Sequence, residues 1–140
     1  MQFVCDAPGR RAWFRIETEA EAALESELMR HAVEKHFRRA YEQASSSYRP
    51  PPGPFIEQDI GRAAHIRRSM PIFLTLRDED GAALVTAMLP PEGPGEPGFR
   101  PILVGQANSD PYAGYGYAIQ ALARHVGITL DRALCYPYRR

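Results

Sequence analysis

The side chains best suited to bind a small ligand lie at the start of a glycine- and tyrosine-rich segment, NSDPYAGYGYAIQALARHVG, residues 108–127. Asp110 or Ser109 can cap a helix that begins at Pro111. The N-terminus of a helix offers free backbone N–H groups and the positive end of the helix dipole, which attract anions. The candidate ligand-binding residues are Asn108, Asp110, Tyr112 and Tyr117. They predict a small-molecule pocket at this helix start, in a binding protein or a small enzyme, although the Asp110 carboxylate opposes an anion.

Packing and capping alone explain the same segment, and this is the favoured interpretation. Gly127, followed by Ile128, is typical of a helix C-terminus, so the helix is expected to span residues 111–126. The phosphate-binding motifs G-x-x-x-x-G-K-[ST] and G-x-G-x-x-G after a strand are both absent. An apolar stripe at helical spacing indicates the face that packs on the core, and it consists of Tyr115, Ile119, Leu122 and Val126.

A local basic cluster lies in the segment RAAHIRRSM, residues 62–70. Its members are Arg62, His65, Arg67 and Arg68. Guanidinium groups bind phosphates and carboxylates, so the cluster could contact RNA, DNA or an acidic protein. Nucleic-acid binding usually adds a wider basic stripe and exposed aromatic side chains, and the acidic residues Glu57 and Asp59 lie close by. An acidic protein partner is therefore favoured over nucleic acid.

Two further sets of side chains have spacings suited to acid–base or metal chemistry. Glu57 and Asp59 would share one face of a strand, and paired carboxylates can act as acid and base, although Arg62 would neutralise them. The second set recurs along one helical face and consists of Glu27, His31, Glu34 and Arg38. Such side chains can hold a metal, but carboxylates with basic neighbours at helical spacing more often form ion pairs. We expect neither a metal nor a cofactor.

No nucleophile motif is present. G-x-S-x-G is absent, and neither Cys5 nor Cys135 lies beside a histidine in sequence, although a catalytic triad can assemble from distant residues. The two cysteines are expected to be small buried side chains, or a disulfide if their segments are neighbours. The sequence therefore favours a non-catalytic accessory or regulatory protein that binds another macromolecule, either as a single chain or as a homodimer.

Composition sets the limits for these alternatives. The chain has 140 residues, 44% hydrophobic and 24% charged residues and a formal net charge of 0, which fits one globular domain over residues 1–140. A neutral chain has no overall attraction to nucleic acid or to an anionic membrane. There is no secretory signal pattern and no apolar run long enough to span a bilayer, so we expect a cytoplasmic protein without a membrane partner.

The elements that must position these side chains predict an α+β fold. Two strands should surround Pro8-Gly9, and a helix should begin at Thr18, with Glu21 completing a capping box, and run to about Ala44. Leu24 and Leu28 lie off the core stripe of that helix and form a candidate partner-binding surface. Proline-rich residues 45–54 should form an extended connection.

Strand-like runs follow in the second half of the chain. A short strand is expected at Phe55–Ile60, followed by a short helix or turn that Pro71 ends. The apolar runs Ile72–Leu76 and Leu84–Leu89 predict a central hairpin. The Gly- and Pro-rich loop at 90–98 should be flexible, residues 100–105 should be a strand, and a last strand could begin at Ile128. We therefore predict a single α+β domain with an antiparallel or mixed sheet of about five or six strands and the two main helices on one face.

Overall fold

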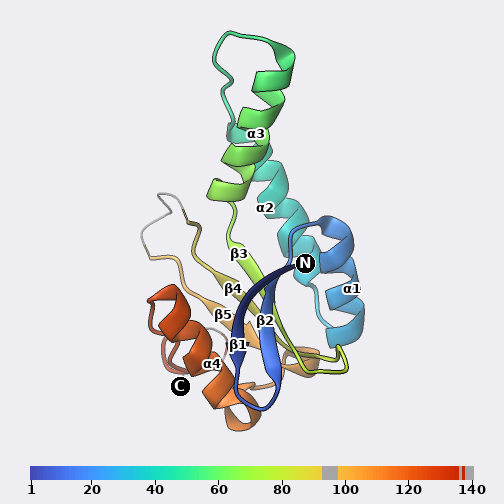
Figure 1. Cartoon of the computed structure of the whole chain (residues 1–140), viewed down its shortest axis with the longest axis vertical. Helices are drawn as coiled ribbons and strands as arrows, with labels where there is room; N and C mark the ends of the chain where they lie inside the picture. Colours follow the sequence, from blue (N-terminus) through green and yellow to red (C-terminus); the bar gives the residue numbers. More distant parts are fainter. Residues whose placement is uncertain (93–97, 136, 138–140) are drawn as a thin grey trace.

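The chain folds into an α+β domain built on a five-stranded antiparallel sheet (Figure 1). The computed structural model describes residues 1–92, 98–135 and 137, so most of the predicted flexible loop and the end of the C-terminal tail lie outside the described residues. The strands lie in the sheet in the order in which they occur in the chain. They are β1 (Gln2–Ala7), β2 (Arg11–Arg15), β3 (Ile72–Arg77), β4 (Ala83–Leu89) and β5 (Ile102–Val104).

In the described part of the chain, four α-helices accompany the sheet, and they cover both of its faces. They are α1 (Glu19–Met29), α2 (Val33–Ser47), α3 (Phe55–Ser69) and α4 (Tyr112–Val126), with a short 3₁₀ turn η1 (Gln106–Asn108) before α4. Along β3 successive side chains alternate, so Leu74 and Leu76 pack with α4, whereas Phe73 packs with Phe37 of α2. The α+β class and the sheet are confirmed, but the two main helices lie on opposite faces rather than on one.

The first helix begins as predicted, and then it breaks. Thr18 caps α1, and the side chain of Glu21 accepts hydrogen bonds from the backbone N–H groups of Glu17 and Thr18. The single helix expected up to Ala44 is wrong, because Arg30 adopts the left-handed conformation (φ 56°, ψ 51°) and ends α1. α2 then starts at Val33 and runs through the serines to Ser47. The break changes the direction of the chain and allows α2 to leave the sheet.

The segment after the prolines is a helix and not a strand. α3 covers both the expected strand Phe55–Ile60 and the short helix after it. Together α2 and α3 form a helical hairpin, called here the arm, whose far end projects well beyond the sheet (Figure 1). Near the base of the arm, Ile66 and Met70 are buried in the same cluster as Phe73. The arm is therefore anchored at its base, while its far end stands away from the core.

The hairpin β3–β4 and the helix α4 confirm the clearest sequence predictions. β3 is the central strand, and it pairs with β4 from Ile72↔Leu89 to Arg77↔Ala83. α4 ends at Gly127, which adopts the left-handed conformation (φ 74°). The strand expected after α4 is wrong, because residues 128–135 form turns and irregular chain.

Candidate functional site

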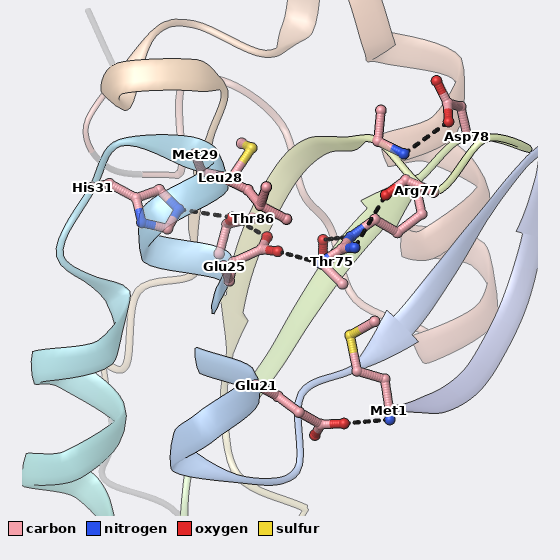
Figure 2. A network of polar contacts seen from close by, with 12 residues as sticks. Met1, Glu21, Glu25, Leu28, Met29, His31, Thr75, Arg77, Asp78 and Thr86 are labelled. Carbon is pink, nitrogen blue, oxygen red and sulfur yellow. Dashed lines mark hydrogen bonds and ion pairs between the residues drawn. The ribbon is translucent and has the colours of Figure 1, made fainter. Parts of the chain in front are cut away.

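A buried polar network joins α1 to the sheet (Figure 2). The Glu25 side chain is fully buried, and one of its carboxylate oxygens accepts a hydrogen bond from the Arg77 guanidinium at 2.8 Å. The other oxygen accepts from the Thr86 hydroxyl at 2.5 Å. Arg77 also donates to Thr75 Oγ1 at 3.0 Å and to the carbonyl of Gly81 at 3.1 Å. A buried carboxylate with both oxygens satisfied is a stable structural charge rather than a free acid or base.

His31 extends this network toward the surface. Its Nε2 lies 2.8 Å from Thr86 Oγ1, and its Nδ1 lies 3.4 Å from the backbone nitrogen of Val33. Because the Thr86 hydroxyl proton is donated to Glu25, Thr86 Oγ1 accepts from His31, so Nε2 carries the proton and Nδ1 accepts. Burial lowers the pKa of His31, more than the nearby Glu25 charge raises it. The imidazole is therefore held neutral.

A half-open pocket of about 650 Å³ lies beside His31, between the start of α2 and strands β4 and β5. Its lining is mostly apolar and includes Phe73, Met88, Ile102 and Val104. Its polar side chains are His31, His36, Thr86 and Asn108. This volume is in the range of small-ligand sites, but His31 and Thr86 already satisfy one another. Among the lining residues that the structure describes, His36 and Asn108 are the polar side chains left to offer hydrogen-bonding groups to a ligand.

The four candidate ligand-binding residues at the start of α4 are not gathered around one cavity. Asn108 lines the pocket described above. Asp110 accepts from the backbone N–H of Tyr112 at 2.9 Å and forms an ion pair with Arg132. The Tyr112 hydroxyl donates to the carbonyl of Leu130 at 2.8 Å, and burial raises its pKa. Tyr117 is 78% exposed on the outer side of α4. Asp110 and Tyr112 thus hold the C-terminal segment onto α4.

Trp13 and the cysteines complete this C-terminal packing. The indole N–H of Trp13 donates to the carbonyl of Ala118 in α4 at 2.9 Å. Cys5 and Cys135 are free thiols, and burial raises the pKa of both. Both are thus kept in the protonated form, which is a poor nucleophile.

The two halves of the predicted partner-binding surface lie on different elements. Leu24 and Leu28 are 50% and 42% exposed on α1, beside the sheet. The other members lie on α3, and most of them contact their own chain. Arg62 donates to the carbonyl of Ser45 at 3.1 Å, and Arg67 forms an ion pair with Glu17 at 2.9 Å.

The two remaining members of the basic cluster differ in their contacts. His65 lies 2.8 Å from the hydroxyl of Ser47, so its ring faces α2. Arg68 is exposed and forms no ion pair with residues 1–92, 98–135 or 137. The local charge is therefore largely used inside the arm and at its base.

The candidate acid–base and metal residues are also placed differently from the sequence prediction. Glu57 and Asp59 lie on a helix, so they do not share a strand face. The break at Arg30 separates Glu27 from Glu34, and Glu34 pairs with Arg38 at 2.8 Å. In the part of the chain that the structure describes, no group of three or more His, Cys, Asp or Glu side chains is placed to hold a metal ion.

Three strongly exposed large apolar side chains lie near the far end of the arm. They are Phe55, Ile56 and Ile60 of α3, with exposed fractions of 85%, 70% and 66%, and they are called here the apolar tip. Sequence reasoning missed this surface because it assigned these residues to a strand. The signal that could have found it is the i, i+4 spacing of Ile56 and Ile60 directly after Pro54, which is typical of a helix start.

The chain was compared with known protein families, proteins and structures. No protein-family model, curated protein or solved structure matches this chain. None of the helices that the structure describes is long and apolar enough to cross a membrane.

Proposed function

We propose that this chain is a non-catalytic accessory protein that acts by binding another protein through the apolar tip of its arm. The supporting observation is the exposure of Phe55, Ile56 and Ile60, each at least 66% exposed on one helix. Single exposed apolar residues are common, but a group of large ones on a projecting element is typical of a surface that a partner covers. Burying one such side chain contributes about 1.5–3 kcal/mol to association.

The surrounding surface favours protein over the alternatives. A nucleic acid would need free guanidinium groups, whereas Arg62 and Arg67 are bonded to Ser45 and Glu17. A small ligand in the pocket beside His31 would meet few free polar groups. A protein that binds the apolar tip needs neither free guanidinium groups nor free polar groups there, because burial of apolar area drives protein association without specific charges.

Site-specific photo-cross-linking in cells tests this proposal. A photoreactive phenylalanine analogue at Phe55 should give covalent adducts to a polypeptide, either a different protein or a second copy of the chain. The matched control carries the analogue at Tyr117, which is similarly exposed at 78% but lies on α4, away from the arm, and should give none. Equal adducts at both positions, adducts only to nucleic acid, or none at Phe55 would refute binding at the tip.

A further inference from the structure

We propose that the partner that binds the apolar tip is a second copy of the chain. The two copies pair in an antiparallel arrangement through the face of α3 that points away from α2, called below the outer face. The inference rests on the proposed function, because it names the partner of two residues of the apolar tip, Ile56 and Ile60. It is carried by the order of apolar and charged residues along α3.

The inner side of α3 is defined by its contacts with α2. His65 reaches Ser47, and Gly61 lies so close to the Tyr48 ring that a Cβ atom there would be 2.3 Å from its hydroxyl oxygen. Ile66 is buried. Residues on the opposite side of the helix therefore point away from α2, and this side is the outer face. At its base, Arg67 lies on this side and bonds to Glu17 and Gln2 of the same chain.

The outer face carries a row of apolar side chains. Ile56, Ile60 and Ala64 recur every four residues, so they lie one above another along the helix. All three are exposed, and the row ends in a small residue that allows close approach of another helix. A row of this kind packs against a similar row on a neighbouring helix.

The charges beside this row are self-complementary. Glu57 lies in the first turn of α3 and Arg68 in the last, and their sequence separation of 11 positions makes close to three full turns. They therefore lie on the same flank of the row. In a two-fold antiparallel pair, each flank of the helix faces the same flank of the other copy. The residues along the two flanks then run in opposite directions. Glu57 of each copy then faces Arg68 of the other.

The position of the two-fold axis follows from the same residues. An axis level with Arg62, the middle residue of α3, brings Ile60 opposite Ala64 and places Glu57 within one residue of the position opposite Arg68. Within residues 1–92, 98–135 and 137, neither Glu57 nor Arg68 forms an ion pair, so both charges are available. The apolar row and the charged flank thus select the same register.

The size of this interface sets the strength of the pairing. A helix of 15 residues is about 22 Å long, so two crossed copies bury an area at the small end of specific interfaces. The dimer should therefore dissociate reversibly, with a dissociation constant on the order of micromolar.

Sedimentation equilibrium on the full chain over a range of concentrations tests the pairing. Glu57→Arg alone and Arg68→Glu alone each place two like-charge contacts in the dimer and should weaken it about tenfold. An equimolar mixture of the two variants should dimerise as well as the original chain, because both contacts are then opposite in charge. The double variant should also recover.

Control variants separate this result from loss of folding. Glu42→Arg changes an exposed charge on α2 and should leave the dimer unchanged. Ile60→Asp should abolish it without lowering the melting temperature. A monomer at every concentration, or single reversals that weaken the dimer without rescue in the mixture, would overturn the pairing. A monomer that still cross-links to a different protein through Phe55 would leave the proposed function standing.

Discussion

At position 25 the chain places a carboxylate fully out of contact with water, and this single residue organises the contact between α1 and the sheet. An ionised group in that position must be paired and hydrogen-bonded, and Arg77 and Thr86 supply both requirements. A buried pair of this kind adds little to stability by itself, whereas loss of one member leaves an uncompensated charge. The network therefore specifies how α1 docks more than how strongly it is held.

We expect Glu25→Ala to lower the free energy of unfolding by about 3–5 kcal/mol, because Arg77 would remain buried and unpaired. Denaturant unfolding followed by circular dichroism measures this change. Glu27→Ala is the control, because Glu27 is exposed on the same helix and should change stability by less than about 0.5 kcal/mol. The double variant Glu25→Leu, Arg77→Met should be less destabilised than Glu25→Ala. A loss below about 1 kcal/mol in Glu25→Ala would show that the network is not needed.

His31 makes the stability of the chain depend on pH. Its pKa is lowered in the folded state from the ordinary value of 6.5, so the unfolded chain binds the proton first as the pH falls. The contribution of the neutral His31 side chain to the free energy of unfolding is fully present above about pH 6.5. It is lost as the pH falls through the lower pKa that His31 has in the folded state.

Melting temperatures measured between pH 8 and pH 5 should therefore fall on the acid side, and His31→Asn should make this decline shallower. His125→Gln, an exposed substitution on the opposite side of the sheet, should retain it. An equally steep decline in His31→Asn would exclude His31 as the source.

At the scale of elements, the turn at Arg30 separates a helix that covers the sheet from one that leaves it. A non-glycine residue in the left-handed region is strained, and glycine relieves that strain at helix ends. We expect Arg30→Gly to raise the free energy of unfolding by about 0.5–1 kcal/mol in a denaturant titration. Arg39→Gly, in the middle of α2, should instead lower it by about 1 kcal/mol. Similar losses in both variants would contradict the role assigned to the turn.

The elements also show which features were predictable from sequence. Local signals succeeded: the capping box at Thr18 and Glu21, the apolar runs of β3 and β4, and the glycine end of α4 depend on near neighbours. The break at Arg30 was not predictable, because no glycine or proline marks it and the turn is held by a tertiary contact from His31 to Thr86. Phe55–Ile60 was misassigned, since a short apolar run fits both a strand and a helix.

Among the candidate sites too, features that depend on near neighbours in the chain were predictable, and features that depend on distant residues were not. The exposure of Leu24 and Leu28 was predictable, because it depends only on their position around one helix. The buried position of Glu25 was not, since its partners Arg77 and Thr86 come from distant strands.

At the scale of the whole molecule, the three-helix segment is an insertion between two strands that are direct neighbours. β2 pairs with β3 along Ala12↔Arg77 to Arg15↔Leu74, and the Ile16 N–H donates to the carbonyl of Phe73 at 2.8 Å. The segment therefore leaves the sheet and returns to it at one place, and α1 and the base of the arm cover the sheet while the far end remains outside the core.

Because the segment leaves and re-enters the sheet at one place, the length of the arm has little effect on the entropy lost when the chain closes between β2 and β3. The entropy lost in joining the ends of a flexible loop grows only with the logarithm of its length, so doubling the loop costs about 0.6 kcal/mol. Insertions or deletions between the far ends of α2 and α3 therefore change the closure entropy little. A lineage could lengthen or shorten the arm, and so alter the surface that α3 offers to the proposed second copy, while the sheet keeps its pairing.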